Sequence, residues 1–385
     1  MCARMAPTCQ WYETGLGRRC LVVILTLNAG SSSVKFAVFD GERAVLRGAI
    51  DTGKAEIRGD TTEPWPYGIE ADGLTRLVAW IDAHDGHAPV SFVGHRVVHG
   101  GDRTGPARVD VALLAELDAL TPLAPLHQPR SLAAIRVLMA THPNLPQIAC
   151  FDTAFHYTMD AVTITLPLPA AWRDAGARRY GFHGLSYAHV ARQPGLGGRV
   201  IVAHLGSGAS LCAMRDGRSV DTTMGMTALD GVMMATRPGR LDPGVLLWLL
   251  QARGLDAAAI EEGLYHRSGL LGVGGAADLR AVDLASLARA MFVRSIVRET
   301  GALAAVLGGV DAVVFTGGIG EYDASIRADV GNALAWLGLA ADARNVSYQP
   351  SMGLARIGPA LWAIPADEEA EIARQVSALT DAEKR

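Results

Sequence analysis

The side chains of this 385-residue chain that could do chemistry lie mainly beside turns rich in glycine and serine. They are mostly cationic, hydroxyl or amide groups with few carboxylates. The set comprises Asn28, Ser31, Ser32, Ser33, Lys35, His95, Arg96, His99, His127, Asp152, His156, His183, His204, Ser207, Ser210, Arg237, Glu321 and Glu368. Cations and hydroxyl donors suit the oxygens of phosphate groups and of a second small anion. The residue types therefore indicate phosphoryl chemistry.

Three glycine turns carry this indication. The first is Asn28–Ser33 ("NAGSSS"), the second lies within His204–Ser210 ("HLGSGAS"), and the third is Gly317–Glu321 ("GGIGE"). Each follows an apolar run, and the third precedes a helical pattern, where outward-pointing amides can bind an anion. A single turn of this kind is usually only a turn, so the prediction depends on the three together.

Lysine is rare in the chain. Of 35 lysines and arginines, only Lys35, Lys54 and Lys384 are lysine. Lys35 follows the first glycine turn, and a compact ammonium there would provide a point charge for phosphate. Its alternation with Val34 and Phe36 leaves a second interpretation, in which it lies on a solvated face of a strand.

The apolar patterns predict the elements that position these residues. Strands are expected over Leu21–Leu27 and Val34–Phe39, which would form a hairpin around the first turn. The segments His87–Arg103 and Pro146–His156 resemble strands with polar ends, and such ends face ligands in open α/β sheets. Helices are predicted over Val111–Ala119, Arg130–Ala140, Pro243–Ala252, Leu284–Leu307 and Asp367–Leu379.

The hairpin pattern occurs twice. Shifting Arg199–Gly217 back by 176 positions (216 minus 40) places Asp216 on Asp40 and Leu211 on Lys35. The chain is therefore predicted to be internally duplicated. Because the copies differ at the lysine, the two turns are expected to do different work.

Composition excludes other classes of protein. A net charge of −4 without a basic run argues against nucleic-acid binding. No segment approaches the roughly 20 apolar residues of a membrane span. The odd number of cysteines without a metal spacing predicts free thiols and a cytoplasmic protein. Residues 1–20 are predicted to be a disordered tail.

Ten segments together resemble the acetate kinase family. They are, in order, "LTLNAGSSSVKFAVFD", "GHRVVHGG", "APLHQP", "FDTAFH", "RRYGFHGLS", "HLGSGAS", "VDTTMGMTALDGVMMATRPGRLDPG", "RSGLLGVGGAADLR", "FTGGIGE" and "ADEE". The resemblance implies the acetate and sugar kinase/Hsp70/actin superfamily. Its α/β fold has duplicated ribonuclease-H-like domains with an active-site cleft between them. We expect domains over residues 21–151 and 152–367, with a helix at about 368–385 packing back on the first.

The resemblance also implies an activity and partners. It predicts reversible, ATP-dependent phosphorylation of acetate to acetyl phosphate by direct in-line transfer. Mg²⁺ would be required, with Mn²⁺ as an alternative, and the protein would be a homodimer. Nucleic acid and membranes are not expected partners.

The matching positions imply specific roles. The predicted catalytic residues are Arg96, His127, Asp152, His183 and Arg237. The acyl group would bind Arg96, Val98, Leu126 and Phe182, and the metal would bind Asn28 and Glu368. The ATP site would comprise Lys35, His204, Leu205, Gly206, Ser207, Gly208, Asp278, Leu279, Arg280, Gly318, Ile319, Gly320, Glu321 and Tyr322.

Asp152 matches the residue that the family labels a proton donor and acceptor. Acetate is already a carboxylate at neutral pH, so the nucleophile has no proton to lose. Our hypothesis is that Asp152 orients an arginine or a metal-bound water.

Several positions depart from the family pattern. Ser207 stands in place of asparagine near the ATP phosphates, so the resemblance leaves both the nucleotide affinity and the phosphate donor open. Ala228 stands in place of proline at the acyl pocket, so a propionate or short-chain acyl kinase is one alternative. A non-catalytic ATP-binding hinge module is another, although it would not need a small-anion site.

Overall fold

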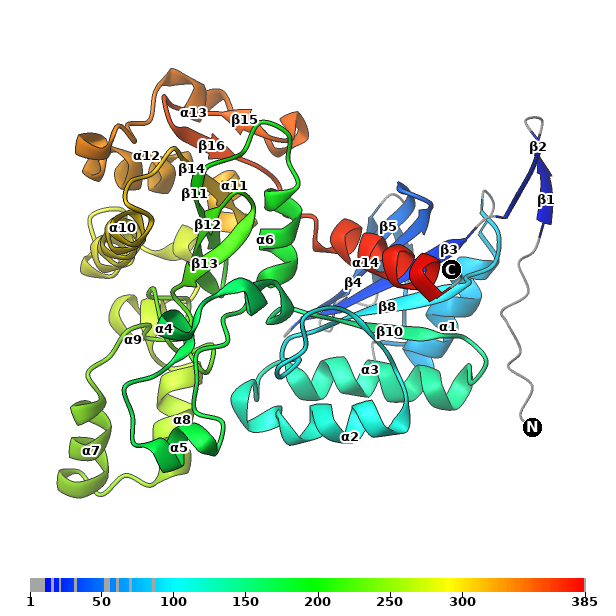
Figure 1. The fold of residues 1–385 in the computed structure, drawn as a ribbon, viewed down its shortest axis with the longest axis horizontal. Coiled ribbons are helices and arrows are strands. Elements are labelled where there is room, and N and C mark those ends of the chain that lie inside the picture. The colour runs from blue at the N-terminus through cyan, green and yellow to red at the C-terminus, as the bar shows by residue number, and fades with distance from the viewer. Residues whose placement is uncertain are drawn as a thin grey trace. The chain divides into compact units, whose positions relative to one another are not determined.

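A computed structural model describes residues 11–14, 17–20, 22–30, 33–51, 56–59, 62–68, 71–84 and 87–383. The chain divides into two compact units (Figure 1). Unit 1 comprises Met1–Ala154 and Glu368–Arg385, and unit 2 comprises Phe155–Asp367. The predicted boundary after residue 151 lies three residues before the observed one, so Asp152 belongs to unit 1.

Unit 1 is built on a mixed sheet. β3 pairs antiparallel with β4, while β8 runs parallel to β3 and β10 runs parallel to β8. In spatial order the strands are β7 (Thr62–Pro64), β6 (Glu56–Gly59), β5 (Arg43–Asp51), β4 (Ser33–Asp40), β3 (Val23–Ala29), β8 (Phe92–Val97), β10 (Gln147–Phe151) and β9 (Ala107–Arg108).

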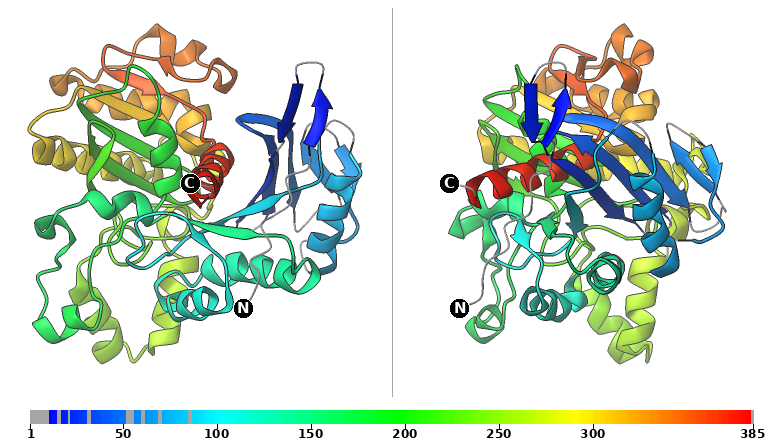
Figure 2. Two further views of the ribbon diagram at one scale, coloured as in Figure 1. Left: turned by 45° about the vertical axis from the view of Figure 1, so that its right-hand side comes forward. Right: turned by 90° about the vertical axis from the view of Figure 1, so that its right-hand side faces the viewer.

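Helices cover both faces of this sheet. α1 (Ala71–Asp82) and α3 (Gln128–Thr141) bury one face in a core that includes Val93 and Leu138, and α2 (Val111–Ala119) packs on α3. The C-terminal helix α14 (Glu368–Glu383) lies against β3, β8 and β10 (Figure 2). A Cβ at Gly94 would lie 2.5 Å from Ile372 Cγ2 of α14. Since Val93 and Gly94 point to opposite faces, α14 covers the second face.

Unit 2 repeats this arrangement. The sheet order is β13 (Arg218–Thr222), β12 (Ala209–Arg215), β11 (Arg199–Leu205), β14 (Ala312–Thr316), β16 (Leu361–Ala363) and β15 (Ala355–Arg356). The longest helices against it are α6 (Gly184–Ala191) and α10 (Leu287–Leu307). The remaining helices are α4 (Ala161–Ile164), α5 (Ala170–Asp174), α7 (Pro243–Ala252), α8 (Ala257–His266), α9 (Gly269–Gly274), α11 (Gly317–Tyr322), α12 (Ala324–Ala333) and α13 (Ala343–Ser347). Short 3₁₀ turns occupy Thr121–Leu123, Ala154–Thr158, Leu279–Ala281, Ala335–Leu337 and Pro350–Met352.

The predicted duplication is confirmed by the order and direction of the strands. In each unit a hairpin, β3–β4 or β11–β12, is followed by two parallel strands, β8 and β10 or β14 and β16. The predicted equivalence of Lys35 and Leu211 is wrong, however. Lys35 pairs with Asn28, and the corresponding pair in unit 2 is Ser210 with His204. The second turn is one residue shorter, and a one-residue slip moves every side chain to the other face.

Two further predictions need correction. Residues 11–14 and 17–20, predicted to be disordered, form the antiparallel strands β1 (Trp11–Thr14) and β2 (Gly17–Cys20). Trp, Tyr and Thr favour strands, and the prediction neglected their presence in the first of them. The third glycine turn is itself helical over Gly317–Tyr322 rather than an open loop before a helix.

Ser31, Ser32, Lys54 and residues 1–10 lie outside the described residues.

Candidate active site

Unit 1 carries an acidic cluster that consists of Asn28, Arg96, Asp152, Glu368 and Glu369. Asn28 and Arg96 are near the carboxyl ends of the parallel strands β3 and β8, and Asp152 directly follows the parallel strand β10. These ends meet at one edge of the sheet, as in other open α/β folds. The two glutamates open α14, where negative charge is favoured by the helix dipole.

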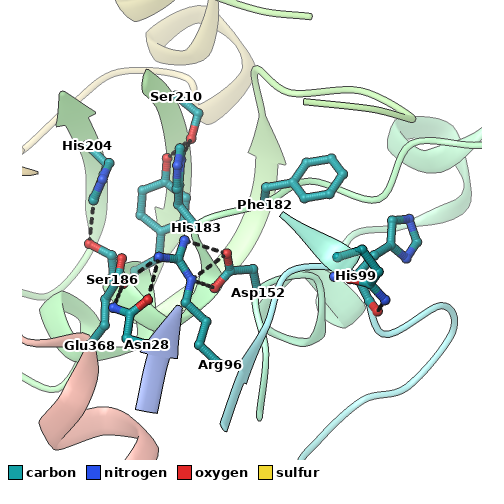
Figure 3. Close-up of polar contacts among 12 residues, drawn as sticks. Asn28, Arg96, His99, Asp152, Phe182, His183, Ser186, His204, Ser210 and Glu368 are labelled. Atoms are coloured by element: carbon teal, nitrogen blue, oxygen red, sulfur yellow. Dashed lines mark hydrogen bonds and ion pairs between the residues drawn. The ribbon is translucent and has the colours of Figure 1, made fainter. Parts of the chain in front are cut away.

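The Arg96 guanidinium is held by acceptors on several sides (Figure 3). Its Nη2 is 2.7 Å from Asp152 Oδ2, and its Nε also donates to both Asp152 oxygens. Its Nη1 donates to Glu368 Oε2 at 2.8 Å and to Asn28 Oδ1 at 3.2 Å. The Asn28 amide nitrogen donates to Glu368 Oε2 at 2.8 Å and Glu369 Oε1 at 2.9 Å. Arg96 is therefore fixed in orientation before any ligand binds.

This cluster has an excess of negative charge. Burial alone would lower the pKa of Arg96, but the charges of Asp152, Glu368 and Glu369 outweigh it and raise the pKa. One guanidinium thus faces three carboxylates. The oxygen-rich donor set fits Mg²⁺, which binds through one or two carboxylates and keeps several waters. Within the described ranges, no group of three or more His, Cys, Asp or Glu side chains is arranged to hold a metal. Asn28 and Glu368 would therefore need water to complete the coordination.

Lys35 lies on the same sheet face as Asn28. The two residues are directly opposite in the β3–β4 ladder, and opposite residues share a face. The Lys35 side chain is exposed and makes no ion pair with a described carboxylate. Its position suits either of the interpretations that the sequence leaves open.

The loop after β8 is tied to the start of α3 by Gln128, which the sequence analysis missed. The buried Gln128 amide accepts from His99 N at 3.0 Å and donates to His99 O at 2.9 Å. Val98 is buried in this loop, and Leu126 and His127 are half-buried just before α3. His99 itself is buried, and burial lowers its pKa to about 4. Only the position of Gln128 at a helix start could have indicated its role.

Unit 2 carries a cationic cluster that consists of His183, His204, Gly208, Ser210 and Arg237. His204 is on β11 and Ser210 on β12, while His183 directly precedes α6 with a left-handed φ of 56°. His183 Nδ1 is 2.8 Å from Ser210 Oγ, and the His183 ring stacks on His204 with centroids 4.3 Å apart. A non-glycine residue in this backbone region is uncommon and often marks a functional position.

Arg237 is the buried cation of this cluster. Its side chain donates to the Ala228 carbonyl at 2.8 Å and forms no ion pair with any described carboxylate. Burial lowers its pKa to about 10, with the nearby Tyr265 acting in the opposite direction. A Cβ at Gly208 would lie 2.6 Å from Arg237 Nη2 and 3.5 Å from His183 Nε2. Glycine at 208 therefore leaves a space where the Arg237 guanidinium and the His183 Nε2 atom converge, and the guanidinium charge suits an anion there.

Residues 23–374 match the sequence profile of the acetokinase family. The chain belongs to the acetokinase family. It is 46% identical to an acetate kinase from Rhodopseudomonas palustris, over 93% of this chain and 98% of that protein. It is 40% identical to an acetate kinase from Streptomyces coelicolor, over 92% and 96%.

Solved structures agree with this membership. A propionate kinase from Francisella tularensis matches with a TM-score of 0.83 at 32% identity, over 92% of this chain and 99% of that one. An acetate kinase from Porphyromonas gingivalis matches with a TM-score of 0.78 at 32% identity, over 93% and 100%. The predicted family and duplicated α/β fold are thereby confirmed.

The third predicted ATP segment of this acetokinase family member is held by Arg327, which the sequence analysis missed. Arg327 is 1% exposed and donates to the carbonyls of Gly320 and Glu321 at 2.9 and 2.8 Å. Its Nε donates to Asn345 Oδ1 at 2.7 Å. The clamp satisfies carbonyls at the end of α11, which would otherwise lack partners. A single arginine within a helical pattern gives no sign of this role.

The other predicted residues differ in their surroundings. Asp278 and Arg280 form an exposed ion pair of 2.6 Å with each other, and Tyr322 is 73% exposed. Phe182 is buried, and its carbonyl lies 3.0 Å from His156 Nε2. Burial lowers the pKa of His156 to about 4, so this histidine is a neutral structural residue at pH 7.

Proposed function

We propose that the chain catalyses the reversible, ATP-dependent phosphorylation of acetate to acetyl phosphate. The observation that carries this proposal is Arg237, a buried guanidinium without a described carboxylate partner, beside His183 Nε2 and Gly208. A buried charge without a partner is costly unless an anion compensates it. A transferred phosphoryl group supplies that negative charge, and membership of the acetokinase family supports this identity.

Phosphoryl transfer requires little covalent help from the protein. The transferred group carries its charge on three equatorial oxygens while the attacking and leaving oxygens lie in line. Arg237 and His183 would donate to those equatorial oxygens. With Mg²⁺ near Asn28 and Glu368 offsetting the negative charge of the acidic cluster, Arg96 would bind the acetate carboxylate, with His127 as a supporting donor. The acyl methyl group would contact Val98, Leu126 and Phe182.

Asp152 orients Arg96 in this account rather than moving a proton. The two-oxygen contact of Asp152 with Nε and Nη2 fixes the guanidinium plane, and acetate has no proton to remove. Mg²⁺, when bound near Asn28 and Glu368, would neutralise phosphate charge. Lys35 would add a point charge toward the phosphates.

ATP would bind unit 2 through three segments. These are His204–Gly208, Asp278–Arg280 and Gly318–Tyr322. Ser207 is exposed, and its carbonyl accepts from Ala235 N at 3.1 Å, so the hydroxyl-bearing turn is anchored to the segment that carries Arg237. The anchored turn would keep the nucleotide phosphates close to Arg237.

Propionate is a second candidate substrate. Ala228 accepts the hydrogen bond of Arg237, and its small side chain is 9% exposed. A small residue at the wall of the proposed acyl pocket would leave room for one further methylene, a change that alters binding by about 1–3 kcal/mol. The match to the Francisella tularensis propionate kinase is consistent with this choice.

We further propose that the protein is a homodimer. α7 and its flanks expose several large apolar side chains, namely Leu241, Leu247, Trp248, Leu250 and Leu255. If these side chains form one contiguous surface, such a surface typically marks a protein–protein contact. Among the described residues, no helix is long and apolar enough to cross a bilayer.

A hydroxylamine trap for acyl phosphate tests the activity. The protein is incubated with ATP, Mg²⁺ and acetate, propionate or butyrate, and the hydroxamate is measured. We expect the highest kcat/KM with acetate. A higher value with propionate would establish the alternative substrate. No hydroxamate with any acid, despite ATP binding, would contradict the enzyme assignment and favour a non-catalytic hinge module.

The role of Asp152 has its own test. Asp152→Asn should lose turnover while the shape of the pH–rate profile stays unchanged. Loss of the acidic limb of that profile would instead identify Asp152 as a proton-transfer group.

A further inference from the structure

Ser210 lies between a tyrosine and the histidine of the cationic cluster. Its Oγ is 2.8 Å from His183 Nδ1 and also hydrogen-bonds to the Tyr187 hydroxyl. Ser210 and Tyr187 are fully buried. Tyr187 is one helical turn after His183, and its N–H donates to the His183 carbonyl at 3.1 Å. The three side chains therefore form a continuous chain, Tyr187–Ser210–His183, inside unit 2.

The direction of this chain follows from the acidity of its members. Each hydroxyl carries one proton, and a neutral imidazole carries its proton on one nitrogen only. A phenol is far more acidic than an aliphatic alcohol, so Tyr187 is the better donor and Ser210 the better acceptor. Ser210 then has its own proton to donate to His183 Nδ1. Successive bonds in one direction strengthen one another in a buried site.

We propose that Tyr187 and Ser210 are positioning residues that keep the ring proton of His183 on Nε2. This inference rests on the proposed function, in which His183 donates to the transferred phosphoryl group. Nε2 is the nitrogen that lies toward Gly208 and Arg237, where that group would bind. With the proton on Nδ1 instead, Nε2 would present a lone pair to the phosphoryl oxygens and repel them.

The surroundings hold the ring in this orientation. His204 stacks on His183 at an interplanar angle of 20°, which hinders rotation of the ring. His204 has its own serine, because its Nδ1 is 2.9 Å from Ser186 Oγ. The Ser186–His204 pair is thus a second contact between a serine hydroxyl and a histidine Nδ1. It can be compared directly with the Ser210–His183 pair. The strained backbone of His183 fits a residue whose orientation is fixed for function.

Three variants test the proposal. Tyr187→Phe removes the first donor, Ser210→Ala removes the link, and Ser210→Thr retains a hydroxyl. Tyr348→Phe is the matched control, because Tyr348 is also a buried tyrosine of unit 2 and its hydroxyl has no partner among the described residues. The tautomer of His183 is read from ¹⁵N ring shifts in histidine-labelled protein, with His183→Gln to assign the signal.

In the wild-type protein we expect the Nε2–H signature for His183. Tyr187→Phe should lower kcat roughly 10-fold and Ser210→Ala roughly 100-fold with little change in either KM, as for the hydrogen-bond partners that orient metal-binding histidines. Both should shift the ring toward the Nδ1–H form, while Ser210→Thr retains the wild-type signature and Tyr348→Phe changes neither measurement.

Unchanged tautomer and kcat in Tyr187→Phe and Ser210→Ala would overturn the proposal, and so would an Nδ1–H signature in the wild type. If Ser210→Ala fails to fold, Tyr187→Phe and Ser210→Thr still decide the question. The NMR measurement needs no turnover. Suppose the wild-type protein forms no acyl phosphate but shows the Nε2–H signature. That result would refute the proposed function, while the role of Tyr187 and Ser210 in holding the His183 proton on Nε2 would stand.

Discussion

The acidic cluster of unit 1 and the cationic cluster of unit 2 lie at equivalent edges of their own sheets. The two clusters have opposite charge. Arg96 is surrounded by Asp152, Glu368 and Glu369, whereas Arg237 is buried without a described carboxylate. The first region is therefore suited to a cation and the second to an anion. The duplication supplied one framework, and exchange of a few side chains gave its two copies complementary chemistry.

The strand registers identify these exchanges. Asn28 and Arg96 directly follow the last registered pair of β3 and β8. The equivalent positions on β11 and β14 are His204 and Thr316, which are paired with each other. Across the hairpins, Lys35 opposite Asn28 corresponds to Ser210 opposite His204. The Asn28 amide of unit 1 is thus replaced by the His204 imidazole in unit 2. The two unit 1 cations, Arg96 and Lys35, are replaced by the hydroxyls of Thr316 and Ser210. In unit 2 the cation comes instead from Arg237, in a loop outside the strands.

The largest effect is expected from removing the cation of the second region. Arg237→Gln should lower kcat roughly 10³-fold, because a donor to the transferred phosphoryl group is lost. The free energy of unfolding should stay the same or rise, since a buried charge without a partner is removed. Steady-state kinetics and urea unfolding measure the two quantities. Arg240→Gln, an exposed arginine in the same segment, should change neither.

Arg237→Gln with near wild-type kcat would contradict the anion-binding role. Lost activity with a large loss of stability would show instead that Arg237 is a structural residue.

The opposite pattern is expected for Arg96. Arg96→Met should abolish activity and also lower the free energy of unfolding by about 3–5 kcal/mol, because buried carboxylates are left without their cation. Arg96→Met combined with Asp152→Asn should regain part of the stability but no activity. Arg136→Met breaks the exposed pair with Asp118 and should cost less than about 1 kcal/mol. An Arg96→Met protein as stable as wild type would remove the contrast between the two arginines.

A smaller difference between the units should appear on acidification. Burial lowers the pKa of His95, His99 and His156 to about 4, so the unfolded chain takes up these protons at a higher pH than the folded one. Above pH ~6.5 these histidines should therefore leave the free energy of unfolding unchanged. Between pH ~6.5 and ~4 they should lower it, by at most about 3 kcal/mol per histidine.

Unit 1 contains two of these histidines, so its segments should lose protection first. Hydrogen exchange followed by mass spectrometry at pH 7 and pH 5 measures this order, and His156→Gln should reduce the change in unit 2 only. Equal protection of unit 1 at both pH values, after correction for the intrinsic exchange rate, would show that the buried histidines do not control acid stability.

Much of the framework could be predicted because local patterns determine it. The helices Val111–Ala119 and Pro243–Ala252 are observed with their predicted bounds, and β3 and β4 lie within two residues of theirs. The bounds of the strands follow from the apolar runs and from the residues that end them. The starts of the two helices follow from their N-caps, Asp110 and Asp242. Asn28, Arg96, Asp152 and Glu368 could be singled out by residue type and polar context, but their joint roles were implied only by the resemblance to the acetate kinase family.

What could not be predicted depends on pairing between distant segments. Ser210 pairs with His204 because the turn between them is one residue shorter than the first turn. The constant shift of 176 positions ignored this difference and wrongly aligned Leu211 with Lys35. Gln128, Arg327 and Tyr187 were missed because each acts through carbonyls or hydroxyls of other elements. Apart from the position of Gln128 at a helix start, nothing in their immediate sequence distinguishes them from ordinary helix residues.

The division into a cation region and an anion region is tested most directly by calorimetric titration of ATP, with Mg²⁺ and with EDTA. Wild type, Arg237→Gln and Glu368→Gln are compared under both conditions. We predict that Arg237→Gln weakens ATP binding with or without Mg²⁺, whereas Glu368→Gln weakens only the binding that Mg²⁺ enhances. The reverse pattern, or equal losses for both variants under both conditions, would contradict the account.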